Sequence, residues 1–192
     1  MIPPEILRIP SAAAGRSRAV AFGDFVWAVA VSPDNQPDMA AQTQKALAVI
    51  EKASFGKTRA RVVCTGIGKP GFIAQKLSAT LSSTGVPSLY LHPAEAAHGD
   101  LGRVAKGDVV VALSNSGATE ELLRLLVPLR HVGVTVIAIT GDVRSPLATA
   151  ADLVVDLGPI HEACPMGLVP TASSAALHAV CDALAMTLAW RR

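Results

Sequence analysis

Large aromatic side chains are scarce in this chain, and so are charges. Aromatic residues make up 4% and charged residues 17% of the 192 residues, whereas hydrophobic residues reach 51%. Small and aliphatic side chains must therefore fill the core, which predicts a tightly packed or oligomeric protein. The net charge of +2 is spread along the chain without a basic stripe, which argues against a nucleic-acid partner.

Metal-binding cysteine patterns and export signals are also missing. The three cysteines show no CxxC or Cys/His spacing, and their odd number gives no complete disulfide framework. The first residues lack the basic segment and apolar core of a secretory signal. Residues 171–190 are long enough to cross a membrane, but His178 and Asp182 interrupt them, which favours a buried helix. We expect a cytoplasmic protein without a metal, a cofactor or a membrane partner.

The first 38 residues are broken by prolines and are predicted to form a separate extension. Two apolar runs at 18–21 and 25–31 flank Gly23-Asp24, a pattern that predicts a β-hairpin. Residues 39–53 follow with a helical period and Asp38 at the N-cap position. We therefore divide the chain into an extension, 1–38, and a ligand-binding domain, 39–192.

From residue 61 onward, apolar runs alternate with helical patterns. This alternation predicts an α/β fold, a three-layer doubly wound sandwich with a five-stranded parallel sheet, preceded by the hairpin and helix. In such folds, ligands bind outside the carboxyl ends of the strands. The expected strands are 61–65, 88–91, 108–113, 134–139 and 153–155, the expected helices are 71–83, 119–131, 146–150 and 171–190, and the loops at strand ends are 66–69, 92–99, 114–121 and 140–144.

The clearest candidate site is the segment from Ser114 to Thr119, which follows a strand and opens an amphipathic helix. Ser114, Asn115, Ser116, Gly117 and Thr119 offer hydroxyls and backbone N–H groups to a phosphate at a helix N-terminus. A serine- and glycine-rich segment is also an ordinary turn with a helix cap, so both interpretations stand.

Two further segments suit the same ligand. Gly66 and Gly68 let the backbone approach a ligand, and the Lys69 ammonium can neutralise a phosphate or a developing oxyanion. Dinucleotide binding is disfavoured because the next strand, 88–91, ends without an acidic residue. The last helix begins with further hydroxyls that either contact the ligand or cap the helix, namely Thr171, Ser173 and Ser174.

Several side chains in these loops can transfer protons. The candidates are Glu95, His98, Glu121, His161 and Glu162. Glu121 lies in the first turn of its helix, where the helix dipole alone explains an acid. Glu162 lies in an irregular stretch where it has no expected role in a helix or strand. Glu162 is therefore the stronger candidate acid.

These motifs together resemble the sugar isomerase (SIS) domain of D-arabinose 5-phosphate isomerases. The resemblance runs from about residue 61 to 188 in order and spacing. It is carried by TGIGK from Thr65, HPAEAAHGDLG from His92, SNSG from Ser114, ITG from Ile139 and EACPMGLVPT from Glu162.

The resemblance implies interconversion of D-ribulose 5-phosphate and D-arabinose 5-phosphate through an enediolate. It also implies a metal-independent mechanism, a sugar phosphate as partner and a homotetramer with sites shared between subunits. Lys69, His98, Glu121 and Glu162 match the family's active-site set. Ser114, Ser116 and Thr119 match its phosphate loop, and Thr171, Ser173 and Ser174 match a hydroxyl-rich segment near the phosphate.

The sequence departs from the family pattern in several places. A His-Pro-Gly-Gly segment, whose histidine belongs to the family's active site, and the paired CBS regulatory modules do not occur in these residues. Pro70, Phe72 and Ala118 replace the usual Ser, His and Glu. A phosphosugar-binding or regulatory module without turnover is therefore the alternative. Residues 15–27 and 40–47 weakly resemble the first half of reactive-intermediate imine deaminases, and we transfer no activity from them.

Overall fold

The computed structural model describes residues 6–9, 18–22, 25–29, 39–55 and 60–191, and its main body is built on one parallel sheet. The strands lie in the order β5-β4-β6-β7-β8, and every neighbouring pair is parallel. This confirms the predicted five-stranded sheet, with each boundary within one residue of expectation. The strands are β4 (Val62–Gly66), β5 (Ser88–Leu91), β6 (Val109–Leu113), β7 (Thr135–Thr140) and β8 (Leu153–Asp156).

Alternate residues of the central strands supply two separate cores. Val109 and Val111 of β6 belong to one buried cluster, whereas Val110 and Ala112 belong to the other. Side chains alternate between the two faces of a strand, so a run of Val and Ala packs against both helical layers. This is why the strands are continuous apolar runs, and it gives the three-layer sandwich that was predicted.

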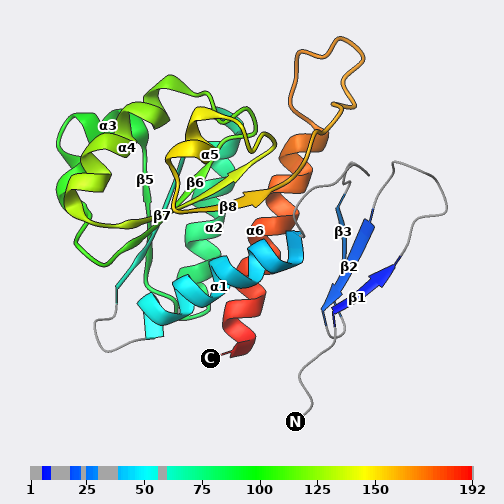
Figure 1. The fold of residues 1–192 in the computed structure, drawn as a ribbon, viewed down its shortest axis with the longest axis horizontal. Coiled ribbons are helices and arrows are strands. Elements are labelled where there is room, and N and C mark those ends of the chain that lie inside the picture. Colours follow the sequence, from blue (N-terminus) through cyan, green and yellow to red (C-terminus); the bar gives the residue numbers. More distant parts are fainter. Residues whose placement is uncertain (1–5, 10–17, 23–24, 30–38, 56–59, 192) are drawn as a thin grey trace.

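Two helical layers cover the sheet (Figure 1). The first cluster joins the sheet to α1 (Met39–Phe55), α2 (Gly68–Ser83) and α6 (Ala172–Arg191). The second joins the opposite face to α3 (Pro93–Ala97), α4 (Glu120–Val132) and α5 (Pro146–Ala150). The order of the strands means that the chain leaves β4 toward one edge and returns past it to β6, which creates a topological switch point between β4 and β6.

Two local differences from expectation have clear physical reasons. Helix α2 begins at Gly68, earlier than residue 71, because proline is tolerated in the first turn and Pro70 lies there. Residues 94–99, which read as a solvated loop, instead contain most of α3. Pro93 takes the first helical position, and His92 Nδ1 accepts a hydrogen bond of 3.2 Å from the Ala94 N–H. A short 3-10 helix, η1 (Asp100–Arg103), follows.

Within the described residues, α6 is long and apolar enough to span a membrane, yet half of its most apolar window is buried inside the molecule. Cys181, Leu184 and Leu188 are fully or almost fully buried against the sheet and its neighbouring helices. Asp182 pairs with the Lys76 ammonium of α2 and lies 3.5 Å from His178. These contacts are those of a core helix, as the interrupted apolar pattern indicated.

A second, smaller sheet precedes α1. Its strands are β1 (Ile6–Ile9), β2 (Arg18–Phe22) and β3 (Phe25–Val29), paired antiparallel in that order. The pairing of β2 with β3 agrees with the expected hairpin, whereas β1 was not expected. The turn at Gly23-Asp24 and the Asp38 cap lie outside the described residues. The domain boundary at residue 38 and the likeness to imine deaminases remain predictions.

Candidate active site

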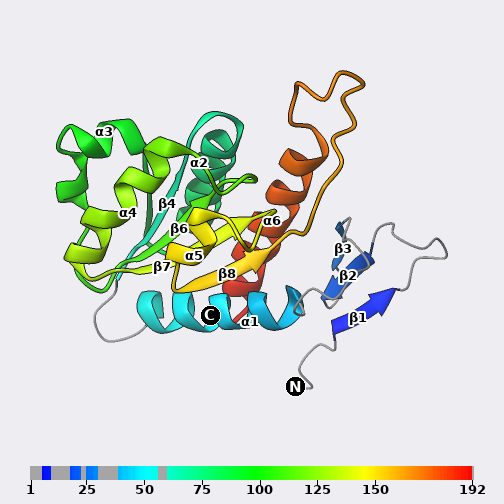
Figure 2. The same ribbon diagram turned by 45° about the horizontal axis from the view of Figure 1, so that its top comes forward.

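The loops that carry the candidate residues meet at the carboxyl edge of the sheet. Because all five strands run in the same direction, the segments after β5, β4, β6 and β7 emerge at one end of the molecule (Figures 1 and 2). The loops after β4 and β6 flank the switch point, which is where doubly wound folds bind their ligands. Here they contain Gly66 to Lys69 and Ser114 to Thr119.

The segment after β6 forms a compact turn in which hydroxyls face one another. Ser114 Oγ lies 3.0 Å from Thr119 Oγ1 and accepts a hydrogen bond of 3.1 Å from the Gly117 N–H. Ser116 Oγ accepts from the Ala118 N–H at 3.3 Å, and Ser116 itself is exposed. Thr119 is the N-cap residue of α4 but makes no capping hydrogen bond with its side chain. The backbone N–H groups at the N-terminus of α4 are therefore not capped by Thr119 and are available to a ligand.

The turn rests on the loop after β7. Gly117 has a φ of +60°, and a Cβ atom there would lie 2.0 Å from Ser145 Oγ. Thr140 Oγ1 and the Gly141 N–H both donate to the Asn115 carbonyl, at 3.2 and 2.9 Å. A glycine is thus required at position 117 by both backbone conformation and space, and the turn is held in one shape.

The segment after β4 is held by a tyrosine of the neighbouring strand. Tyr90 Oη donates a hydrogen bond of 2.9 Å to the Gly66 carbonyl, and a Cβ atom on Gly71 would lie 2.9 Å from the same oxygen. The absence of a side chain at Gly71 lets α2 approach β4 closely. Gly68 has a φ of +62° with open space around it, and Lys69 is exposed in the first turn of α2.

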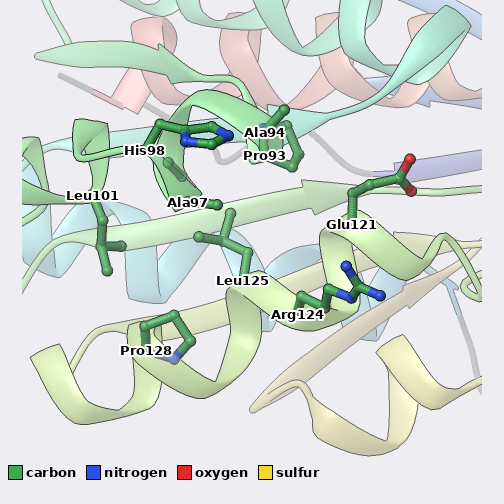
Figure 3. Close-up of a pocket in the computed structure, with 10 residues that line it drawn as sticks. Pro93, Ala94, Ala97, His98, Leu101, Glu121, Arg124, Leu125 and Pro128 are labelled. Carbon is green, nitrogen blue, oxygen red and sulfur yellow. The ribbon is translucent and has the colours of Figure 1, made fainter.

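A cavity of about 420 Å³ lies between α3, η1 and α4 and contains two of the predicted catalytic residues. Figure 3 shows His98 at the end of α3, with Glu121 and Arg124 on α4 across from it. The rest of the wall is apolar and is formed by Pro93, Ala94, Ala96, Ala97, Leu101, Leu125 and Pro128. Apolar walls around a few polar groups are typical of small-molecule sites. Glu95, also a candidate, does not line this cavity.

Glu162 has a structural role that the sequence did not reveal. Its Oε2 accepts hydrogen bonds from the Thr171 N–H at 2.7 Å, the Thr171 hydroxyl at 3.1 Å and the Ser173 N–H at 3.3 Å. The carboxylate thereby caps the N-terminus of α6. Burial alone raises the pKa of Glu162, but the hydrogen bonds from Ser173 and Thr171 outweigh it and lower the pKa from 4.5 to about 2.

The hydroxyls at the start of α6 mostly form hydrogen bonds with Glu162 and with the backbone of the loop before the helix. Thr171 Oγ1 also accepts from the Ala163 N–H at 2.9 Å, and Ser174 Oγ lies 3.4 Å from the Pro170 carbonyl. Ser173 is 1% exposed. The loop before α6 extends away from the body and from α3 and α4 (Figures 1 and 2). Glu162 therefore does not line the cavity of His98 and Glu121 within one chain.

Three polar residues near these loops were missed by the sequence reasoning. Tyr90 holds the Gly66 carbonyl, and a lone tyrosine in an apolar strand was a usable signal because a buried hydroxyl needs a partner. Arg124 joins the cavity wall one turn after Glu120, with which it forms an ion pair. Asp156 ends β8 and is 3% exposed. Burial raises its pKa, which the Gly158 N–H partly opposes and the Asp142 charge reinforces.

Comparison with known proteins identifies the family to which this fold belongs. The family model described as the SIS domain matches residues 56–187. The chain belongs to the SIS domain family. It is 49% identical over 130 residues to the arabinose 5-phosphate isomerase KdsD of Pseudomonas aeruginosa. This match covers 68% of this chain and 40% of that protein. The KdsD protein of Escherichia coli K12 is 48% identical over 130 residues, with the same two coverages.

Solved structures show the same SIS fold. A protein of E. coli CFT073 in complex with arabinose 5-phosphate matches with a TM-score of 0.68 and 39% identity, covering 80% of this chain and 87% of that one. A crystal structure from Bacteroides fragilis NCTC 9343 matches with a TM-score of 0.75 and 36% identity, covering 78% and 79%. The chain spans about two fifths of the length of the curated relatives it matches.

Proposed function

We propose that this SIS domain binds a pentose 5-phosphate and interconverts D-ribulose 5-phosphate and D-arabinose 5-phosphate. The observation that carries the proposal is the cavity that holds His98 and Glu121 beside the hydroxyl-rich turn at the start of α4. The names of the relatives, arabinose 5-phosphate isomerase, and the arabinose 5-phosphate complex of a similar structure support the choice of sugar.

The phosphate binds at the turn between β6 and α4. The hydroxyls of Ser114, Ser116 and Thr119 donate to phosphate oxygens, and the positive end of the α4 dipole favours the dianion. Gly117 and Asn115 keep the turn in shape through their contacts with the loop after β7. Thr171, Ser173 and Ser174 remain in the proposed set as hydroxyls near the phosphate in the assembled protein.

The reaction needs one base and one group that moves a proton between two oxygens. Glu121 takes the proton from C1 of ribulose 5-phosphate, which gives an enediolate, and returns a proton to C2 to form the aldose. His98, across the cavity, protonates O2 and accepts the proton of O1. The Lys69 ammonium stabilises the oxyanion as it develops, from the glycine-rich end of β4.

Glu162 is a poor candidate for the base in the geometry of the single chain, and Glu121 takes that role because it lines the cavity. A carboxylate whose pKa is about 2 and that accepts several hydrogen bonds binds a proton weakly, whereas general bases work best with a pKa near the working pH. Glu162 is then a residue that orders the start of α6. It can still join the site of a neighbouring subunit, because Met166 and Leu168 expose 74% and 75% of their surface on the same loop.

Those exposed apolar side chains also support the proposed homotetramer. Val169, at 47% exposure, adds to the apolar surface of the loop before α6. Burial of such a surface against another copy is favourable by about 25 cal/mol per Å². Light scattering of the purified chain tests this part: a tetramer agrees with the proposal, and a monomer at micromolar concentration contradicts it.

The isomerase activity is tested by proton exchange. Purified chain is incubated with ribulose 5-phosphate in D₂O, and NMR follows arabinose 5-phosphate and deuterium at C2. Formation of deuterated aldose supports the proposal. Calorimetry with arabinose 5-phosphate runs in parallel, so that binding without any exchange identifies a phosphosugar-binding module instead, and the absence of both rejects a sugar-phosphate site.

A further inference from the structure

Two buried side-chain oxygens near the carboxyl edge of the sheet, one after β6 and one at the end of β8, have no hydrogen-bond partner among the described residues. Asp156 is 3% exposed, and its Oδ2 is buried without a hydrogen bond from any residue that the structure describes. Asn115 Oδ1 is likewise buried without a partner. Leaving a buried carboxylate oxygen unpartnered is costly, so a proton, a water molecule or a cation must compensate it.

The backbone places Asp156 and Asn115 on either side of the segment Thr140-Gly141, at the end of β7. Asp156 pairs in register with Thr140 across β7 and β8, and the Leu157 N–H donates to the Thr140 carbonyl at 2.8 Å. Gly141 follows directly, and the position a Cβ would take there lies 2.6 Å from Asn115 Oδ1 and 3.2 Å from the Gly158 carbonyl oxygen. A glycine at 141 therefore allows oxygens of the loops after β6 and β8 to lie close to the loop after β7.

A second, exposed carboxylate belongs to the same loop after β7, close enough for its charge to act on Asp156. Asp142 follows Gly141, and its Oδ1 accepts a hydrogen bond of 2.8 Å from the Arg144 N–H. The Arg144 guanidinium is 3.9 Å away but 92% exposed, so it screens the carboxylate only weakly. Asp156 Oδ1 is occupied by the Gly158 N–H at 2.8 Å, which leaves Oδ2 as the free atom. Two negative charges thus share one region with little compensation.

We propose that the side chains of Asp156, Asn115 and Asp142, with the Gly158 carbonyl, bind one divalent cation of the magnesium or calcium type. Hard cations prefer carboxylate, amide and carbonyl oxygens, and this set supplies all three kinds. The two carboxylates match the charge of a divalent ion. Because Asn115 also belongs to the turn after β6, the bound ion would stiffen that turn and the end of β8 together.

The proposal does not depend on isomerase activity, and its test uses only stability and ion binding. The protein is first treated with a chelator and is then melted in MgCl₂ or CaCl₂ at concentrations up to about 10 mM, which is enough to saturate weak sites. KCl is added to hold the ionic strength constant. We expect a saturable rise in Tm with one of the two ions, because a ligand of the folded state stabilises it. Calorimetry should give one ion per chain.

Matched variants locate the effect. Asp156→Asn keeps the oxygen that accepts from Gly158 and should abolish the rise in Tm. Asp142→Asn changes an exposed side chain but keeps the oxygen that accepts from the Arg144 N–H, and it should weaken ion binding about tenfold or more even if Asp156→Asn fails to fold. Asp152→Asn is the control: Asp152 lies just before β8, where it accepts from the Val136 N–H, and its variant should keep the response. The absence of an ion effect in the wild type, or an equal effect in the Asp142 variant, overturns the proposal and leaves a bound water or proton as the explanation.

Discussion

Glu162 and Thr171 are joined by two hydrogen bonds, one from the backbone N–H and one from the hydroxyl of Thr171, both to the same carboxylate oxygen. The pair closes the loop that precedes α6. A carboxylate at a helix N-terminus satisfies free N–H groups and interacts favourably with the helix dipole. An acid that the sequence placed in an irregular stretch thus fixes where the last helix begins.

The first prediction concerns acid stability. Glu162 has a lowered pKa, so its stabilising effect is fully present above pH 4.5 and is lost as the pH falls toward 2. Glu162→Gln should therefore lower Tm at pH 7, and the difference from the wild type should shrink to nothing near pH 2. Thermal melts across this range measure it.

Glu120→Gln is the control for that experiment. Glu120 is exposed and pairs with Arg124 on the surface of α4, an interaction that contributes little. Its variant should melt within the error of the wild type throughout. If the Glu162 variant behaves in the same way, the cap does not stabilise the protein.

A second prediction addresses the turn after β6. Gly117→Ala forces a side chain into a left-handed conformation and against Ser145, and we expect a loss of about 2 kcal/mol or more. For a domain of this size that corresponds to a fall in Tm of roughly 4–8 °C. Gly102→Ala is matched, because a Cβ there meets nothing within 4 Å. Equal melting of the two variants would show that the turn adjusts freely.

The sheet could be predicted from sequence because its signal is local. Val109 to Leu113 is fully buried, and a short run of Val and Ala between turn residues is typical of a strand inside a parallel sheet. The start of α2 and the existence of α3 were less accessible. Pro70 and Pro93 each occupy the first turn of a helix, where proline is allowed, so both helices include residues that were expected in loops.

The site was predictable by residue type more than by geometry. Ser114 and Gly117 follow a strand, and strand ends in an α/β fold are where ligands bind. The partners of Glu162 and the cavity shared by His98 and Glu121 depend on contacts between distant segments, which no local pattern encodes. Asp156 was missed for the same reason, since its burial follows from the loops around it.

A third prediction tests the phosphate turn. Ser114→Ala removes the hydroxyl that lies 3.0 Å from Thr119 Oγ1 and accepts from the Gly117 N–H. Hydrogen bonds to charged groups contribute about 1.5–3 kcal/mol, so the Kd for arabinose 5-phosphate should rise about 10- to 100-fold. Calorimetry measures the Kd. Ser82→Ala is the control, because it removes an exposed hydroxyl at the end of α2. This variant should bind arabinose 5-phosphate with the Kd of the wild type.

A fourth prediction separates the roles of two lysines of α2. Lys69 lies in the first turn of the helix, and Lys76 pairs with Asp182. Lys69→Gln should lower kcat/KM for ribulose 5-phosphate by about tenfold or more, because an ammonium that stabilises an oxyanion is lost. Lys76→Gln should instead lower Tm with kcat/KM unchanged. If Lys69→Gln leaves kcat/KM unchanged and Lys76→Gln lowers it, Lys69 does not belong to the active site.

The proposed mechanism depends most on the base in the cavity between α3 and α4. The decisive measurement is kcat for ribulose 5-phosphate with Glu121→Gln, beside the wild type and Glu162→Gln. Loss of a general base costs about 100- to 10,000-fold, so Glu121→Gln should fall by that factor while remaining folded, and Glu162→Gln should fall less. Turnover of Glu121→Gln at the wild-type rate would contradict the account.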